Sequence, residues 1–187
     1  FQTRKNVLEY DDVMNQQRNI IYDERRKVLD GEDLREHINS MVREFISSNL
    51  NDKLNGGSAE NQEHLDEALS PFEKLFYRRG SIKYDEFKGR ANVEKLTDAI
   101  YDIAQNEYSR REEGFGLDPN GNPVMRELER VIMLRVVDEY WMDHIDAMDE
   151  LKRGIGLRGY GNVKPIDAYK QEGFDMFEAM VNGIREE

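Results

Sequence analysis

Apolar residues recur at helical spacing along most of this chain of 187 residues. The range 4–29 contains no glycine or proline, and apolar residues fall there every seven positions. These are Val7, Met14, Ile21 and Val28, with Leu8, Tyr22 and Leu29 beside three of them. This spacing predicts a long helix with a narrow apolar seam. Because polar Asn15 and Gln17 interrupt the seam, we expect a helix that packs against other elements rather than a self-standing coiled coil.

The middle of the chain alternates between helical patterns and polar, glycine-containing stretches. The first pattern covers residues 33–51, and the stretch NDKLNGGSAENQ after it predicts a surface loop. SPFEKLF then predicts a helix start, with Ser70 as N-cap and Pro71 in the first helical position. Residues 93–108 predict another helix, whose inward face is Leu96, Ile100, Ile103 and Ala104. The stretch GFGLDPNGNP that follows has the composition of a loop.

Two apolar stripes of helical period occupy the C-terminal third of the chain. The first contains Val124, Leu128, Val131, Leu134, Val137, Trp141, Ile145, Met148 and Leu151. A helix of that extent is about 42 Å long at 1.5 Å per residue. The second contains Tyr169, Gly173, Phe177, Met180 and Ile184. LKRGIGLRGYGNVKP separates them, so the pattern predicts an antiparallel helical hairpin with this stretch at its bend, and an all-α protein.

The composition fits long helices that are largely exposed. Charged residues make up 35% of the chain and hydrophobic ones 38%, and mean hydropathy is −0.84. The net charge of −12 argues against general nucleic-acid binding, and the absence of cysteine excludes disulfides and thiolate zinc sites. No apolar run approaches 18 residues, so no membrane span is expected. Since the chain starts with Phe1 and shows no signal-peptide pattern, we expect it to be a piece of a longer protein.

The stretch 151–165 is a basic exception in this acidic chain. It contains no acid, and its cations are Lys152, Arg153, Arg158 and Lys164. Tyr160 lies between Gly159 and Gly161 rather than on a periodic stripe. An exposed ring beside cations can contact a peptide, a lipid headgroup or a protein groove. The alternative is that the ring packs over the end of the hairpin, and the sequence leaves both interpretations open.

Other candidate sites do not survive inspection of their spacing. DPNGNPVMRELE places oxygen-bearing residues as a calcium loop does, but Pro123 stands where that loop needs glycine. His37, His64 and His144 form no H-E-x-x-H or E-x-x-H pair, so no metal site is expected. We interpret His144, which has acids around it, as a partly exposed helix residue. No phosphate-binding glycine motif is present, and we expect no enzymatic site in these residues.

Two stretches resemble the SecA family, the bacterial ATPase that drives preproteins through the SecYEG channel. They are LEYDDVMNQQRNIIY (8–22) and WMDHIDAMDELKRGIGLRGYGNVKPIDAYKQEGFDMFEAM (141–180). Residues between them match in position and helical character more than in motif. The resemblance implies a long scaffold helix at 1–34, a helical wing domain at 35–122 and a two-helix finger at 123–187 that returns to the scaffold.

The resemblance also implies roles for individual residues. Tyr160 matches the finger-loop tyrosine that contacts the moving polypeptide. The residues around it at the tip are Leu157, Arg158, Gly159 and Gly161, and the basic residues near the tip are Lys152, Arg153 and Lys164. Many members have histidine where this chain has Gly156. The first finger helix, with Tyr140 and Trp141, matches the part of the family that restrains ATP turnover.

The implied partners are the SecYEG channel, the preprotein, the motor domains of the same chain and, as an option, an anionic lipid surface, without nucleic acid. ATP and Mg are expected only in motor domains that lie outside this sequence, with no cofactor or metal in these residues. The implied location is the cytoplasm, peripherally on the inner face of the plasma membrane. An alternative is a non-catalytic helical adaptor whose basic turn docks on an acidic partner. An RNA-binding hairpin is disfavoured by the net charge.

Overall fold

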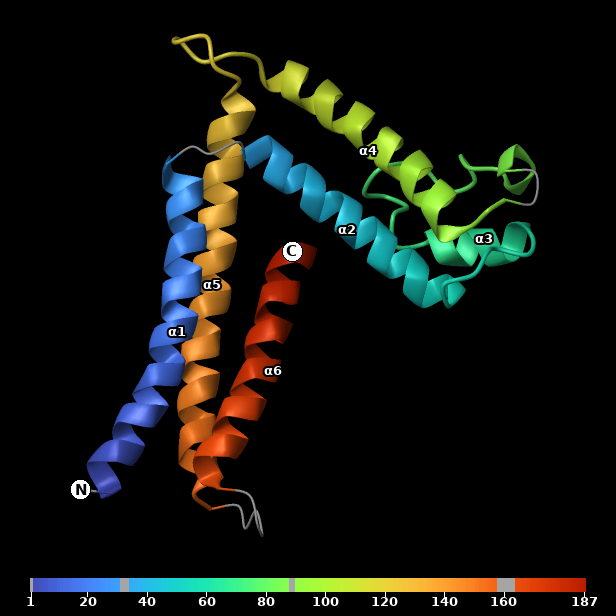
Figure 1. Ribbon diagram of the computed structural model, residues 1–187. Helices are drawn as coiled ribbons and strands as arrows, with labels where there is room; N and C mark the ends of the chain where they lie inside the picture. The colour runs from blue at the N-terminus through green and yellow to red at the C-terminus, as the bar shows by residue number, and fades with distance from the viewer. Residues whose placement is uncertain (1, 31–33, 88–89, 158–163) are drawn as a thin grey trace. The chain divides into compact units, whose positions relative to one another are not determined.

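The computed structural model describes residues 2–30, 34–87, 90–157 and 164–187, and their side chains from Val7 onward. Its helices are α1 (Gln2–Asp30), α2 (Leu34–Leu54), α3 (Gln62–Leu69), α4 (Val93–Phe115), α5 (Val124–Ile155) and α6 (Pro165–Glu186), with a short 3-10 helix at Tyr84–Phe87 (Figure 1). The described ranges contain no β-strand, only isolated bridges such as the one between Ser58 and Asn92. The predicted all-α class is confirmed.

The chain divides into two compact units. One, called here the bundle unit, consists of Phe1–Glu32 and Leu128–Glu187, and the other, the α2–α4 unit, is Asp33–Glu127. The division into scaffold, wing and finger at residues 34 and 122 stays a prediction.

In the bundle unit, α5 and α6 run in opposite directions and lie close together. Gly183 is so near Tyr140 that a β-carbon on it would lie 2.5 Å from a carbon of the Tyr140 ring. Ten residues earlier, a β-carbon on Gly173 would lie 2.7 Å from the terminal methyl of Met148. As the α6 number falls, its α5 partner's number rises, which is the antiparallel arrangement seen in Figure 1.

Helix α1 lies antiparallel to α5 and parallel to α6 (Figure 1). Arg25 near its end pairs with Asp138 at 2.9 Å, and Asp11 near its start lies 3.7 Å from the ammonium of Lys152. Two buried clusters fill the space between the three helices: Ile21, Val137, Trp141, Phe177 and Met180, and then Met148, Leu151, Ile155, Ala168 and Tyr169. Each cluster draws on the period-3.6 stripes of more than one helix.

The α2–α4 unit has its own core. It is built by Ile46, Leu50 and Leu54 of α2, Leu65, Ala68 and Leu69 of α3, Leu96 and Ile100 of α4, and loop residues Ala59, Phe72, Ile82 and Ala91. Helix α4 begins at Asn92, whose side chain accepts a hydrogen bond from the N–H of Lys95, as an N-cap does. Arg35 of α2 pairs with Glu112 of α4 at 2.7 Å on the outside of this core.

One predicted helix start is wrong. Ser70 does not begin a helix but ends α3, and both its N–H and its hydroxyl donate to the carbonyl of Glu67. The helix cannot continue through Pro71, because proline has no N–H and its ring collides with the preceding turn. The N-cap is Asn61 instead, whose side chain accepts from the N–H of His64 at 3.0 Å.

The predicted seam and the first C-terminal stripe are buried over only part of their lengths. On α1, Ile21 and Val28 are buried, whereas Val7, Leu8, Tyr22 and Leu29 are exposed. On α5, the stripe is buried at Val137, Trp141, Met148 and Leu151, whereas Val124, Leu128 and Val131 are exposed. Periodicity identifies the apolar face of a helix, and the length of its packing partners decides how much of that face is covered.

Candidate functional site

The predicted finger tip, residues 157–161, belongs to the part of the chain between the end of α5 and the start of α6. Arg158, Gly159, Tyr160 and Gly161 lie outside the described residues. Leu157, the last described residue before them, is 89% exposed. Lys164 is exposed and precedes Pro165, which takes the first position of α6.

Two residues of the predicted basic patch, Lys152 and Arg153, lie beside acids that the sequence pattern did not predict as their partners. The ammonium of Lys152 lies 3.7 Å from Asp11 of α1 and 5.5 Å from the centre of the Tyr10 ring. Arg153 forms an ion pair with Asp149, one turn earlier on the same helix. Both cations remain substantially exposed, so their charge at this end of the bundle is partly balanced rather than removed.

An aromatic pair closes the bundle beneath these cations. Tyr169 of α6 is 1% exposed and meets Tyr10 of α1 edge to face, with ring centres 4.8 Å apart. Burial, followed by the charges of Asp11 and Asp149, raises the pKa of Tyr169 to about 12. The phenol therefore stays neutral near pH 7, and it can pack against Tyr10 without burying a charge.

The two α5 residues implied to have a regulatory role lie inside the bundle. Trp141 is 7% exposed and belongs to the cluster that contains Ile21 and Phe177. Tyr140 is half-buried, with its ring against Gly183 of α6. Their described contacts are therefore internal, between α5 and the two helices beside it.

A buried polar group that the sequence did not predict links all three helices. Gln17 of α1 is 7% exposed; its side-chain nitrogen donates to the carbonyl of Gly173 at 3.2 Å, and its oxygen lies 2.7 Å from Nε2 of His144. The interpretation of His144 as partly exposed is wrong, since the residue is 5% exposed. Helical spacing could have revealed both positions: Gln17 lies three residues after Met14, and His144 three after Trp141, so each is on its helix's apolar face.

The burial of His144 predicts a pH dependence of stability. Burial lowers the pKa of His144 below its ordinary value of 6.5, so the unfolded chain takes up a proton at a higher pH than the folded chain does. The free energy of unfolding should be fully retained above pH 6.5 and should fall as the pH drops from there through the folded pKa. We expect His144→Gln to flatten this slope in urea unfolding curves between pH 5 and 8, as it removes the titrating ring and keeps an N–H donor. Exposed His37 gives the control His37→Gln, which should keep the slope, and an equal flattening in both variants would contradict the assignment.

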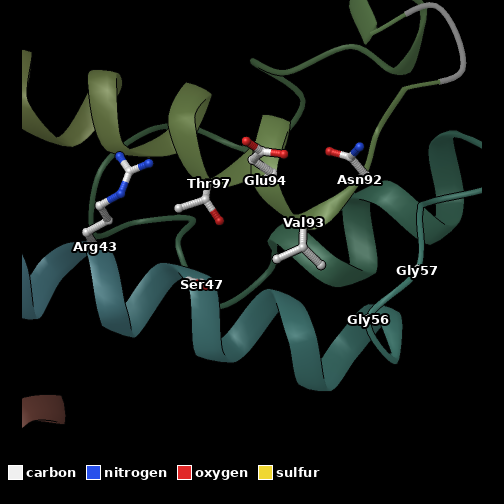
Figure 2. Close-up of a pocket in the computed structure, with 8 residues that line it drawn as sticks. All are labelled: Arg43, Ser47, Gly56, Gly57, Asn92, Val93, Glu94 and Thr97. Atoms are coloured by element: carbon white, nitrogen blue, oxygen red, sulfur yellow. The ribbon is translucent and has the colours of Figure 1, made fainter.

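An open hollow of about 410 Å³ lies between α2 and α4 in the other unit (Figure 2). Two of its polar groups serve the fold: Arg43 pairs with Asp98, and Asn92 caps α4. Thr97 is 4% exposed, and its hydroxyl oxygen is buried without a hydrogen-bond partner, but a single hydroxyl does not make a binding site. We therefore place no candidate site in this hollow.

In the calcium-like loop, the first acid, Asp118, accepts hydrogen bonds from the backbone of the loop itself. Backbone N–H groups of Asn120 and Asn122 donate to the Asp118 carboxylate at 2.8 and 2.9 Å. These bonds, the one from Asn122 first, lower the pKa of Asp118. In the part of the chain that the structure describes, no cluster of three or more acids or histidines could hold a metal ion. None of the helices there combines the length and the apolar composition needed to cross a bilayer.

Comparison with known proteins gives consistent results over the whole chain. The family model described as the SecA Wing and Scaffold domain matches residues 1–187. The protein translocase subunit SecA of Clostridium acetobutylicum is 43% identical over 187 residues, which are 100% of this chain and 22% of that protein. SecA 1 of Clostridioides difficile is 46% identical and SecA of Finegoldia magna 45%, each over 100% of this chain and 20% of the relative. This chain thus spans about a fifth of the length of these relatives.

Proposed function

This chain belongs to the SecA family, and on that premise we propose that it is the scaffold, wing and finger portion of a protein translocase subunit. The whole protein would couple ATP hydrolysis to the movement of preproteins through the SecYEG channel. The observation that carries the proposal is the match of the wing and scaffold family to every residue of the chain. ATP and Mg would bind in motor domains of the parent protein, with no cofactor in residues 1–187.

The proposed mechanical part is the α5–α6 pair. Two long helices that pack through Gly173 and Gly183 form a stiff support, and Leu157 at its end is 89% exposed. In the proposal, the turn that follows meets the channel and the polypeptide, with Tyr160 as the contacting ring. An aromatic ring offers a large contact area and a hydroxyl at low entropic cost, which suits a substrate of varied sequence.

The other roles are proposed on the same family basis. Residues 1–34 would be the scaffold helix, 35–122 the wing and 123–187 the finger, with Tyr140 and Trp141 in the helix that restrains ATP turnover. Lys152, Arg153 and Lys164 would face acidic channel loops or anionic lipid at the inner face of the plasma membrane, where the cytoplasmic protein would bind peripherally. The alternative is an adaptor whose basic turn docks on an acidic protein, because this turn is the basic exception in a chain whose net charge is −12.

Site-specific cross-linking tests the proposal. A photoreactive amino acid replaces Tyr160 in the full-length protein, and translocation is stalled with a folded domain at the end of the preprotein. We expect adducts with the preprotein at this position. The same probe at Phe174, which is 55% exposed on α6, serves as the control and should give few such adducts.

Two other outcomes would contradict the proposed contact between Tyr160 and the preprotein. Adducts confined to the same chain would show that Tyr160 packs over the end of the α5–α6 pair. Adducts with a third protein, and neither with the channel nor with the preprotein, would favour the adaptor.

A further inference from the structure

The donor and the acceptor can be assigned in each hydrogen bond of Gln17, the buried polar side chain of the bundle unit. Gln17 reaches from α1 to two different helices, to the Gly173 carbonyl of α6 and to the His144 ring of α5. A carbonyl oxygen can only accept a hydrogen bond, so the side-chain nitrogen of Gln17 must face Gly173. Its oxygen then faces His144 and can only accept.

This orientation determines where His144 carries its proton. Because the Gln17 oxygen accepts, Nε2 of His144 must be the protonated nitrogen, and the distance of 2.7 Å fits such a hydrogen bond. The three side chains described in contact with the imidazole are uncharged: Gln17 from α1, Phe177 from α6, and Trp141 on the same helix, the last two with ring centres 5.7 and 5.6 Å from it. A neutral imidazole with the proton on Nε2 is the form that these surroundings favour.

The apolar contacts and the exposed ion pairs described for α1 constrain its position less than a buried hydrogen bond does. Apolar contacts, such as those of Ile21 with Val137, resist separation of the helices but tolerate small rotations and sliding. The ion pair of Arg25 with Asp138 is bidentate, at 2.9 and 3.2 Å, but its side chains are 38% and 47% exposed, so solvent and salt weaken it relative to a buried contact. A buried amide bonded on both sides is costly to misalign, since each lost partner leaves a buried polar group unpaired.

We propose that Gln17 is a positioning residue: its side-chain amide ties the α5–α6 pair to α1 at His144 and Gly173, and so fixes the direction in which the C-terminal end of α5 points. The consequence for translocation rests on the proposed function, whereas the tie itself does not. From His144 to Ile155, α5 continues for about 17 Å at 1.5 Å per residue. A tilt of about 10° at the tie would therefore move that end of α5 by about 3 Å.

The test compares two glutamines that are adjacent on α1. Gln17→Met keeps the length of the side chain and removes both hydrogen bonds, whereas Gln16→Met makes the same change at an exposed position. Spin labels are attached in the full-length protein to cysteines introduced as Arg18→Cys and Arg153→Cys, both at exposed positions. Residues 1–187 contain no cysteine, and any cysteine elsewhere in the full-length protein is replaced first. We expect the distance distribution between the labels to broaden by about 3 Å or more in Gln17→Met and to stay unchanged in Gln16→Met. Superimposable distributions for Gln17→Met and the parent would overturn the proposal.

A second variant covers the case in which Gln17→Met does not fold. Gln17→Glu keeps the shape and accepts from His144 but cannot donate to the Gly173 carbonyl. We expect imidazole nitrogen NMR shifts to show the neutral Nε2-protonated form of His144 in the parent and a raised pKa of His144 in Gln17→Glu. An Nδ1-protonated ring in the parent, or a pKa that the variant leaves unchanged, would count against the tie.

The translocation rate, measured separately, separates this inference from the proposed function. The label distances and the imidazole shifts need neither ATP nor preprotein, so they test the tie even if the family role proposed for Tyr160 fails. If Gln17→Met broadens the distribution and slows translocation while Gln16→Met does neither, the positioning role is supported. Unchanged translocation by a Gln17→Met protein with a broadened distribution would overturn the positioning role.

Discussion

Ile21→Asp is expected to destabilise the bundle unit by at least about 3 kcal/mol, because a carboxylate would replace an alkyl group in a core that offers it no partner. Ile21 is 4% exposed and packs among Val137, Trp141, Phe177 and Met180. The cation one turn further on, Arg25, is already held by both oxygens of Asp138, at 2.9 and 3.2 Å. Chemical denaturation followed by Trp141 fluorescence would measure the change, because Trp141 lies in this core and is the single tryptophan of the sequence.

The chain supplies a matched control for this prediction at the preceding position. Ile20 is 51% exposed, so Ile20→Asp introduces the same charge on the same helix without burying it. It should change the free energy of unfolding by less than about 0.5 kcal/mol. Equal midpoints for Ile21→Asp and Ile20→Asp would show that α1 does not pack against α5 and α6 as described.

Phe72→Ala is expected to destabilise the α2–α4 unit by about 3 to 5 kcal/mol, the usual range for truncating a buried phenylalanine. Phe72 has no exposed surface, and its ring meets that of Phe45 edge to face, with centres 5.8 Å apart. The truncation would leave a cavity at the contact between the α3 end and α2, which the backbone around Pro71 is poorly able to close. Amide hydrogen exchange should show the loss of protection within Asp33–Glu127, since that unit has its own core.

Phe115 provides the comparison for this truncation, because it is a phenylalanine of the same unit that is 53% exposed. Phe115→Ala should cost less than about 1 kcal/mol. Faster exchange in the bundle unit than in the α2–α4 unit of Phe72→Ala would contradict the separation of the two cores.

Helical period was sufficient to predict the class and most of the helices. It predicted a helix just after Pro165, where α6 begins at Pro165 itself, and the predicted stripe is buried at Tyr169, Gly173, Phe177 and Met180. It also placed the inward face of α4, where Leu96 and Ile100 have no exposed surface. These predictions succeeded because α6 and α4 each pack against a neighbour along most of the predicted stripe, so the pattern in the sequence and the burial in the structure agree.

The wrong predictions concern polar residues whose hydrogen bonds cannot be read from the apolar pattern of one helix. Ser70 followed by Pro71 is a sequence typical of a helix start. In the structure the Ser70 hydroxyl donates a hydrogen bond to the carbonyl of Glu67, and Ser70 ends α3 instead. Gln17 and His144 are polar, and their burial is offset by the hydrogen bond between them and by the one from Gln17 to Gly173. Helical spacing places each residue on the apolar face of its helix, but the two lie 127 residues apart in sequence, so no local pattern predicts that they pair.

The glycines of the bundle unit differ in how much room surrounds them, which bears on how the chain can drift in evolution. At Gly183 a single methyl group would collide with the ring of Tyr140, so a new side chain there requires a compensating change on another helix. At Gly154 and Gly156, next to the turn, an added β-carbon would meet nothing within 4 Å. Packing should therefore tolerate new side chains at Gly154 and Gly156, whereas Gly173 and Gly183 should change only together with Met148 and Tyr140.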